Sequence, residues 1–494
     1  MKAALPAQDS GEGLDAAIQD TLGPIADRIT EIVFYSVSIG GVEITLIVVW
    51  LIIAALFFTF YLGFMNVRGF KHAIDLVRGR YSNPDDAGEV SHFQALATAV
   101  SGTVGLGNIA GVAVAIALGG PGATFWMIVA GFLGMSSKMA ECTLGVKYRR
   151  ENADGTISGG PMYYLSRGLS LQGKAGLGKV LAALFAVFCI GSSLGAGNMF
   201  QANQATQQII NVTGGDDSPF ADLRWLLGLL FAIAVAIVIL GGIKSIARVT
   251  ERLVPAMAIV YITACLIVIL GNISDVPAAF GAIIEGAFAP DAAAGGILGV
   301  LIIGFQRAAF SNEAGIGSAA IAHSAVRTKE PATEGFVALL EPFIDTIVIC
   351  TMTALTIVIS GVYADPDAAE LAGVSLTSRA FETVLPWFPN ILAIAVVLFA
   401  FSTMISWSYY GMKATRYLAG DNAVAETVFK VVFCGFVVIG ASLALGPVIG
   451  ISDSMVFLMS IPNVIGLYLM ARVIKREITQ YRKKLADGEI VRVK

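Results

Sequence analysis

Two strings of the sequence share a pattern of small and polar residues. One is Ser101-Gly102-Thr103-Val104-Gly105-Leu106-Gly107-Asn108, and the other, 210 positions later, is Ser311-Asn312-Glu313-Ala314-Gly315-Ile316-Gly317-Ser318. Both follow Ser-x-x-x-Gly-(Leu/Ile)-Gly-(Asn/Ser). Because each glycine weakens a helix by about 1 kcal/mol relative to alanine, the strings predict helix breaks. Freed amides at a helix N-terminus bind anions, and freed carbonyls bind cations.

Other residues with binding chemistry lie in apolar stretches. Ser402 and Thr403 are adjacent hydroxyls whose oxygens suit a hard cation, although such hydroxyls also bond back to the carbonyl four residues earlier. On the residues alone both interpretations stay open. Six ionisable side chains share such apolar surroundings: Lys138, Glu141, Arg307, Glu313, Glu341 and Asp345.

Spacing suggests roles for these ionisable residues. Lys138 and Glu141, three positions apart, are predicted to form a structural pair or gate. Arg307 and Glu313 flank the predicted break in the span at 296–320 and are predicted to be gate partners. Glu341 and Asp345, one helical turn apart, could bind a second cation or a proton.

The scattered cysteines and histidines predict no redox or zinc chemistry. The five cysteines show no CxxC spacing, and His72, His92 and His323 lie far apart in the sequence.

The composition places these residues in a membrane protein. Of 494 residues, 56% are hydrophobic and only 14% are charged, too few charges to cover a soluble protein of this size. The net charge of −4 argues against nucleic acid as the main partner. Residues 1–20 are polar and show no signal peptide.

Apolar runs of about 20 residues predict eleven transmembrane helices, and the fold class is all-α. The predicted spans are residues 43–64, 94–118, 123–145, 179–199, 224–243, 252–273, 296–320, 335–360, 388–411, 427–449 and 454–472. Residues 20–41 and 375–387 predict amphipathic helices on the membrane surface.

Basic residues predict the orientation of these spans. Of 32 Lys and Arg residues, 26 fall in alternate loops and the C-terminal tail, and four fall on the opposite side. Since basic loops remain cytoplasmic, the N-terminus is expected outside and the C-terminus inside.

The two broken spans begin two sets of five, spans 2–6 and 7–11. Because five is odd, the second set enters the membrane with the opposite orientation, which predicts an inverted repeat preceded by one extra helix. Secondary transporters bind substrate and coupling ion at such breaks. The alternative is that these glycines only allow close helix packing.

Motifs along the chain resemble a known family. The string 104–108 is similar to the broken first core helix of sodium-coupled amino-acid transporters such as the bacterial leucine transporter. The wider set resembles the alanine or glycine:cation symporter family over residues 45–475. The motifs that carry this resemblance are residues 101–109, 136–141, 159–164, 197–203 and 310–317.

The resemblance implies sodium-driven uptake of alanine or glycine and assigns residues to the site. The amides of Leu106 and Gly107 would hold the substrate carboxylate, and the carbonyl of Thr103 would lie near its amino group. Sodium would bind the hydroxyls of Ser402 and Thr403 and the carbonyls of Ser101 and Val104. The predicted sixth span has no lysine, whereas the best-known proton-coupled relatives of this fold carry one there; this favours sodium over protons.

Further side chains are predicted to contact the substrate. A small substrate needs a few amide partners and a wall that limits its size. The predicted residues are Asn198, Gln201, Phe305 and Trp407.

Three domains are expected: an extracytoplasmic segment with an amphipathic helix (1–41), a transport domain (42–475) and a basic cytoplasmic tail (476–494). The protein is predicted to be a non-enzymatic inner-membrane symporter with Na⁺ as coupling ion and no other cofactor. Expected partners are a small neutral amino acid, Na⁺ and the lipid bilayer, with no nucleic acid and no obligate protein partner.

The rival functions are a symporter of a larger amino acid, a channel, a membrane enzyme and an ATP-driven pump. A sodium- or proton-coupled symporter of a larger amino acid could use the same fold. A channel is disfavoured because the filter-like string 103–107 occurs once, within a long apolar run. Enzyme and ATP-driven pump signatures such as HExxH and Walker A are absent from the sequence.

Overall fold

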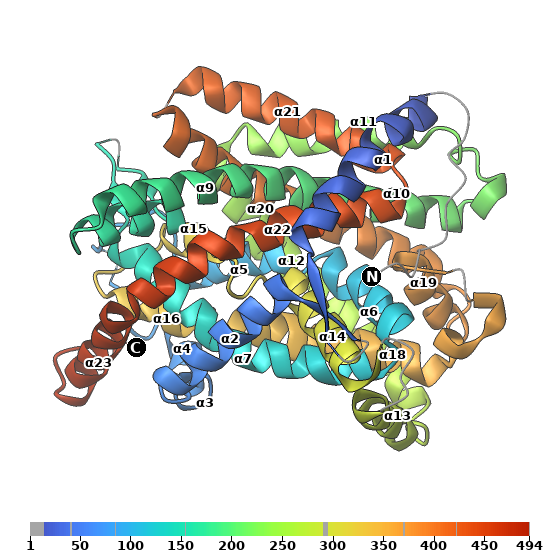
Figure 1. Cartoon of the computed structure of the whole chain (residues 1–494), viewed down its shortest axis with the longest axis horizontal. Helices are drawn as coiled ribbons and strands as arrows, with labels where there is room; N and C mark the ends of the chain where they lie inside the picture. Colours follow the sequence, from blue (N-terminus) through green and yellow to red (C-terminus); the bar gives the residue numbers. More distant parts are fainter. Residues whose placement is uncertain are drawn as a thin grey trace.

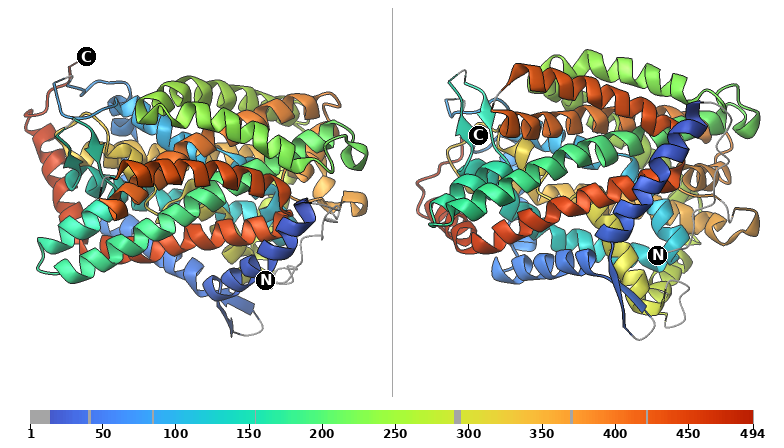
Figure 2. Two further views of the ribbon diagram at one scale, coloured as in Figure 1. Left: turned by 90° about the horizontal axis from the view of Figure 1, so that it is seen from above. Right: turned by 45° about the horizontal axis from the view of Figure 1, so that its top comes forward.

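Helices make up nearly all of the fold. The computed structural model describes residues 14–39, 42–83, 85–153, 155–289, 295–368, 371–420 and 422–493. Within these ranges the β-structure consists of two short antiparallel hairpins and one isolated bridge. The long helices run side by side across the molecule (Figures 1 and 2).

The N-terminal region differs from the predicted helix at 20–41. Helix α1 (Leu14–Val33) is followed by a hairpin of β1 (Ser36–Ile39) and β2 (Val42–Thr45), in which Val37 is opposite Ile44. Alternating β-branched residues favour strands over helix here. Helix α1 packs along α22 (Leu445–Leu469), and α2 (Leu46–Tyr61) follows the hairpin. Two short helices continue the chain: α3 (Met65–Arg68) and α4 (Phe70–Val77).

The first broken span is followed by four long helical segments. The span consists of α5 (His92–Thr103), the π-helical turn η1 (Gly107–Gly111) and α6 (Val112–Gly119). The elements after it are α7 (Gly122–Lys147), β3 (Arg150–Glu151), β4 (Ile157–Ser158), α8 (Pro161–Tyr163), η2 (Tyr164–Gly168), α9 (Ala175–Leu194), η3 (Gly195–Met199), α10 (Phe200–Val212), η4 (Gly215–Asp217), α11 (Arg224–Ile239) and α12 (Gly242–Gly271).

The second half has a similar succession of long helices. It comprises α13 (Val276–Phe288), α14 (Gly296–Asn312), α15 (Ala319–His323), α16 (Pro331–Ala338), α17 (Leu340–Pro342), η5 (Phe343–Cys350), α18 (Thr351–Ser360), η6 (Val362–Ala364), η7 (Pro366–Ala368), α19 (Val374–Glu382), α20 (Phe388–Ala419), α21 (Ala423–Ser442), α22 and α23 (Ala471–Ala486). Helix α19 occupies most of the predicted amphipathic segment at 375–387.

Each predicted span overlaps a helix, but several boundaries were wrong. The span predicted at 179–199 continues through η3 to Val212, so Asn198 and Gln201 lie within the helical segment rather than at its end. The turn predicted near 449–454 lies at 443–444 instead. Pro447 stands in the first turn of α22, where proline is tolerated, and Asp453 is therefore inside that helix.

Several helices have the length and composition to span a bilayer. Among the described residues, six qualify singly, and α5 with η1 and α6 forms a further bent pair. Helices α2, α11, α13 and α14 are shorter and apolar. The outward faces of the apolar helices expose large side chains such as Ile237 in α11, Ile259 in α12 and Val431 in α21, which is expected where lipid is the solvent. The chain is therefore an integral membrane protein.

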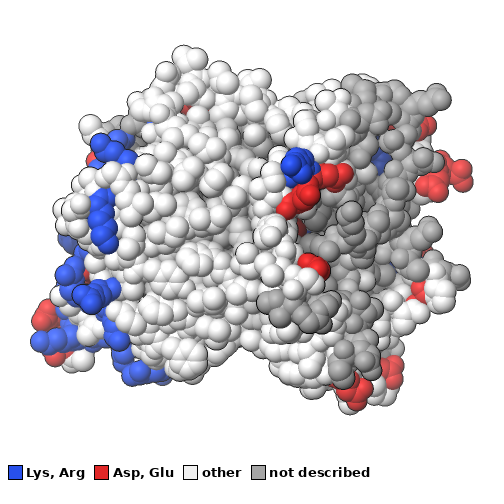
Figure 3. Space-filling model, in the orientation of Figure 1, with Lys and Arg blue, Asp and Glu red and all other residues white. Residues whose placement is uncertain are grey.

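Charge separates along the molecule. In Figure 3 lysines and arginines gather at the end that carries α23, many acidic residues lie at the other end, and the surface between is almost uncharged. A wide uncharged band between charged ends fits a protein that crosses a bilayer.

Candidate substrate and cation site

The first predicted break is present and bends its span sharply. Helix α5 ends at Thr103, the chain resumes helical form at Gly107, and the two parts meet at 50°. Val104 leaves helical geometry (φ −75°, ψ 89°). The side chain of Asn108 accepts a hydrogen bond from the Gly105 amide at 2.9 Å, which stabilises the turn. The break therefore combines carbonyls at the end of α5 with amides at the start of η1.

Helix α20 crosses this break at very short range. A Cβ atom added at Gly105 would lie 2.4 Å from Thr403 Oγ1, so only glycine fits there. The Thr403 hydroxyl donates to the Ser101 carbonyl at 3.0 Å, and the Ser101 hydroxyl donates to the Ser402 carbonyl at 2.9 Å. Ser406 donates to the Ser101 hydroxyl at 3.0 Å. Hydroxyl and carbonyl oxygens are thereby gathered in one buried place.

Two of the predicted cation ligands differ in how they face this cluster. Thr403 points its hydroxyl at the break, whereas the Ser402 hydroxyl donates to the Phe399 carbonyl at 2.9 Å within its own helix. Ser402 approaches Ser101 through its backbone carbonyl instead. The adjacent hydroxyls thus occupy different faces of α20.

Predicted substrate residues also meet at the break. The Leu106 amide donates to Gln201 Oε1 at 3.2 Å, and Gln201 Nε2 donates to the Ala196 carbonyl at 2.9 Å. Trp407 Nε1 lies 3.3 Å from the Gly102 carbonyl and 3.1 Å from Glu313 Oε1. Leu106, Gln201 and Trp407 come from three elements, and each is at most 4% exposed.

The remaining predicted substrate residues make other contacts in the structure. The Thr103 hydroxyl faces the carbonyls of its own helix at 3.3 and 3.4 Å. Asn198 donates to the Phe433 carbonyl in α21 at 2.6 Å, away from the broken span. Phe305 is buried in α14 as part of the main apolar core.

The second break ends α14 with three left-handed residues. Glu313, Gly315 and Gly317 have φ of 56°, 87° and 95°. A Cβ at Gly317 would lie 2.7 Å from Pro161 Cγ, so glycine serves both backbone conformation and close packing. The Glu313 side chain accepts hydrogen bonds from Ser318 and Trp407. This carboxylate therefore connects the second break to α20.

The two breaks touch each other, and Asp345 joins them. The Cβ position of Gly107 is 3.3 Å from the Ser311 Cα atom. Asn108 donates to Asp345 Oδ1 at 2.6 Å, while Ser311 and Thr346 donate to Oδ2 at 2.9 and 2.7 Å. Asn108 was not among the predicted site residues. Its occurrence in the first string was the available signal.

The ionisable residues pair across helices rather than along them. Lys138 pairs with Glu341 at 3.2 Å, and Glu141 accepts from Asn463 at 2.8 Å, so the predicted Lys138–Glu141 pair was wrong. Arg307 pairs with Asp453 of α22. The predicted Arg307–Glu313 pair was therefore wrong too, because Asp453 lies within α22 rather than in a turn.

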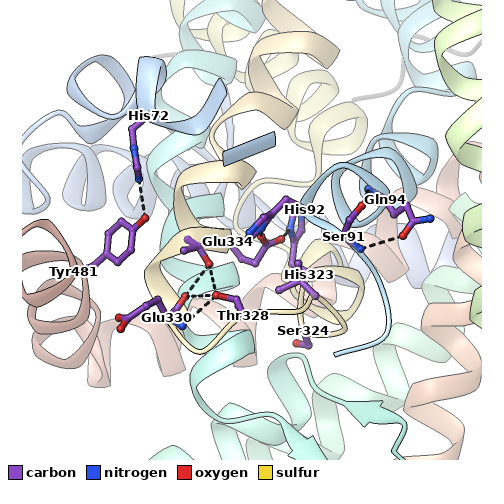
Figure 4. A network of polar contacts seen from close by, with 12 residues as sticks. His72, Ser91, His92, Gln94, His323, Ser324, Thr328, Glu330, Glu334 and Tyr481 are labelled. Atoms are coloured by element: carbon purple, nitrogen blue, oxygen red, sulfur yellow. Dashed lines mark hydrogen bonds and ion pairs between the residues drawn. The ribbon is translucent and has the colours of Figure 1, made fainter. Parts of the chain in front are cut away.

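A buried chain of charged groups starts at the first residue of α5. His92 and His323 both contact Glu334, one on each carboxylate oxygen (Figure 4). The other ring nitrogen of His323 lies 2.6 Å from Glu341, which also pairs with Lys138. Both ring nitrogens of His323 face carboxylates, so the contacts are satisfied when this imidazole is protonated. The two histidines, distant in sequence, thus belong to one network.

Buried oxygens and amides at two touching helix breaks define a membrane transport protein of the broken-helix type. Comparison with known proteins agrees: the sequence model described as "Sodium:alanine symporter family" matches residues 29–494. The chain belongs to the sodium:alanine symporter family.

Named relatives differ in substrate. The chain is 41% identical over 429 residues to "Sodium/alanine symporter AgcS" of Methanococcus maripaludis, covering 87% of this chain and 92% of that protein. It is 34% identical over 447 residues to "Probable sodium/glutamine symporter GlnT" of Bacillus subtilis, covering 90% and 89%. A solved structure, MhsT in complex with L-phenylalanine, matches with 17% identity and a TM-score of 0.49 over 78% of this chain and 88% of that chain.

Proposed function

We propose that this protein imports a small neutral amino acid, alanine or glycine, together with Na⁺ by alternating access. The observation that carries the proposal is the meeting of Thr403, Ser101 and Gly105 at the first break. Carbonyl and hydroxyl oxygens are available there to a hard cation, and amides are available to a carboxylate. The family and its alanine-symporting relative support this choice.

The eleven-span inverted repeat remains part of the proposal. Spans 2–6 and 7–11 each begin with a helix broken at a matching string, and the breaks are in contact. The concentration of basic residues at the end carrying α23 supports a cytoplasmic C-terminus and an outer N-terminus.

The substrate carboxylate would bind the amides of Leu106 and Gly107. In the structure Gln201 Oε1 accepts from Leu106, and a carboxylate oxygen would take over that hydrogen bond. The released Gln201 side chain could then turn its amide group toward the substrate. Contacts of the substrate with Thr103, Asn198 and Phe305 remain predictions. They require either that these side chains move or that the substrate approaches them more closely.

The cation would be held by the Thr403 hydroxyl with the carbonyls of Ser101 and Val104. Ser402 remains a proposed ligand through rotation of its hydroxyl away from Phe399. Because Ser101, Thr403 and Trp407 are at most 1% exposed, ion and substrate reach the site only when the helices separate. Such opening to one side at a time is what alternating access requires.

A symporter of a larger amino acid is the second candidate, favoured by the relative named for glutamine. Tight packing of Trp407 against Gly197 opposes a larger substrate, because it leaves little space beside the ring. A Cβ atom added at Gly197 would lie 2.2 Å from Trp407 Cβ. The direct test is uptake of labelled alanine into proteoliposomes with and without an inward Na⁺ gradient. Uptake independent of sodium would contradict the proposed coupling, and preferred uptake of glutamine would favour the second candidate.

A further inference from the structure

A basic cavity lies outside the two breaks, where α23 packs beside the end of α2. It encloses about 470 Å³, and four basic side chains line it: Arg68, Lys475, Arg482 and Lys483. Among the described residues no carboxylate forms an ion pair with any of these four. Their other contacts are weak: Arg68 Nη1 is 3.4 Å from the Gly63 carbonyl, and Arg482 Nη1 is 4.0 Å from the Met65 sulfur.

Helix α23 is anchored, so the cavity is preformed. The Tyr481 hydroxyl lies 2.8 Å from His72 Nε2 of α4 (Figure 4). Two ion pairs add to this contact, Lys147–Glu477 at 2.7 Å and Lys484–Glu330 at 2.5 Å. Burial lowers the pKa of His72 despite the nearby Asp75, so the ring is uncharged at neutral pH. Helix α23 is therefore held in place by contacts that leave Lys475, Arg482 and Lys483 without an ion-pair partner among the described residues.

An exposed apolar surface adjoins the cations. Phe60 is 65% exposed, Val67 is 61% exposed, and the rings of Phe60 and Phe64 pack 5.2 Å apart. Lys475 lies over the ring of Tyr61, the last residue of α2, at 4.6 Å. Uncompensated cations beside exposed aromatic side chains match a phospholipid, with a charged headgroup above apolar chains.

Another basic cavity provides a contrast, because three of its four basic side chains already contact protein groups. It is lined by Lys147, Arg149, Arg167 and Lys179. Arg149 donates to backbone carbonyls including those of Ser324 and Val326, and Lys147 pairs with Glu477. Lys147, Arg149 and Arg167 thus stabilise the fold, whereas the basic residues near α23 remain available.

We propose that the cavity formed by α2, α3 and α23 binds the headgroup of an anionic phospholipid. The phosphate lies among Arg68, Lys475 and Arg482, and the acyl chains run along Phe60 and Phe64. The exposed apolar surface selects a lipid over a soluble phosphate. Binding holds α23 against α2 at the membrane surface.

The test is native mass spectrometry of the purified protein with phosphatidylglycerol and, separately, phosphatidylcholine of the same acyl chains. We expect the wild type to retain phosphatidylglycerol preferentially. The triple variant Arg68→Gln, Lys475→Gln, Arg482→Gln should lose this preference. Each charge removed should lower the affinity for phosphatidylglycerol roughly fivefold. The single variant Lys475→Gln should show about a fivefold loss and serves if the triple variant folds poorly.

A matched control removes three exposed charges outside the cavity. The variant Lys174→Gln, Arg472→Gln, Arg476→Gln should keep the preference. An equal loss in this control, or none in the cavity variants, would overturn the proposal. Displacement of phosphatidylglycerol by equimolar glycerol 3-phosphate would also overturn it, because the site would then bind a soluble anion. Retention of binding by Arg68→Lys, Arg482→Lys would support recognition by charge.

Discussion

The hydroxyl of Thr403 donates a hydrogen bond to the carbonyl of Ser101 across 3.0 Å, joining α20 to the end of the first half-helix. The contact forms because Gly105 has no side chain and α20 approaches the break closely. It offers two oxygens of different elements to one cation. Its geometry motivates the first prediction.

Thr403→Ala should raise the sodium concentration for half-maximal alanine uptake by roughly tenfold or more. Losing an interaction with a charged partner costs about 1.5–3 kcal/mol. The measurement is initial uptake in proteoliposomes against sodium concentration. Thr356→Ala is the matched control, since Thr356 is also fully buried but bonds to Met352 in its own helix. Unchanged sodium dependence in Thr403→Ala would show that the cation binds elsewhere.

Gly105→Ala should abolish uptake while Gly111→Ala should retain it. The added methyl at Gly105 would lie 2.4 Å from Thr403 Oγ1, whereas at Gly111 it would lie 4.0 Å from the Leu106 carbonyl oxygen. Overpacking of this kind costs about 1–3 kcal/mol and displaces α20. Uptake of labelled alanine, normalised to protein inserted in the liposomes, measures the effect. Equal activity of the two variants would mean that close packing at this break is not required.

Sequence patterns located the breaks but not the partners of the charged side chains. The two strings predicted both interruptions because glycine acts on the local backbone. Arg307 was wrongly paired because its true partner, Asp453, depends on where α22 begins. His92 and His323 are separated by 231 positions in the sequence, and only packing of α5 against α15 brings both to Glu334. Ser402 and Thr403 could not be distinguished without knowing which face of α20 meets the break.

His323→Leu should destabilise the protein strongly. It leaves the carboxylates of Glu334 and Glu341 buried without the imidazole between them, and breaking a buried charge pair costs about 3–5 kcal/mol. Thermal unfolding of the purified protein should show a clearly lower Tm. His72→Leu, which removes one hydrogen bond to Tyr481 at a partly buried position, is the control and should have a smaller effect. A Tm loss in His323→Leu no greater than in the control would argue against the charged network.

Cysteine labelling tests the orientation. In a Cys434→Ser background, the remaining native cysteines are buried. The side chains of Leu171 and Ile273 are 80% and 60% exposed. A cysteine at position 171 should be labelled from the cytoplasm, and a cysteine at position 273 should be labelled from outside. Membrane-impermeant maleimide applied to intact cells and to inverted vesicles distinguishes the two sides. Labelling of both positions from the same side would remove the basis for the inverted repeat.

Substrate size should be set at Trp407. Its ring packs against Gly197 and Tyr410 and reaches the Gly102 carbonyl, so it forms a wall of the proposed site. Trp407→Ala should let valine and leucine compete with labelled alanine, since each methylene accommodated gains about 0.8 kcal/mol. Gly107→Val should abolish uptake, because its side chain would crowd Ser311, whose Cα is 3.3 Å from the Cβ position. Trp387→Ala, 59% exposed at wild type, is the control and should leave the competition profile unchanged. If leucine competes as well as glycine in the wild type, Trp407 does not limit substrate size, and a symporter of larger amino acids becomes the better description.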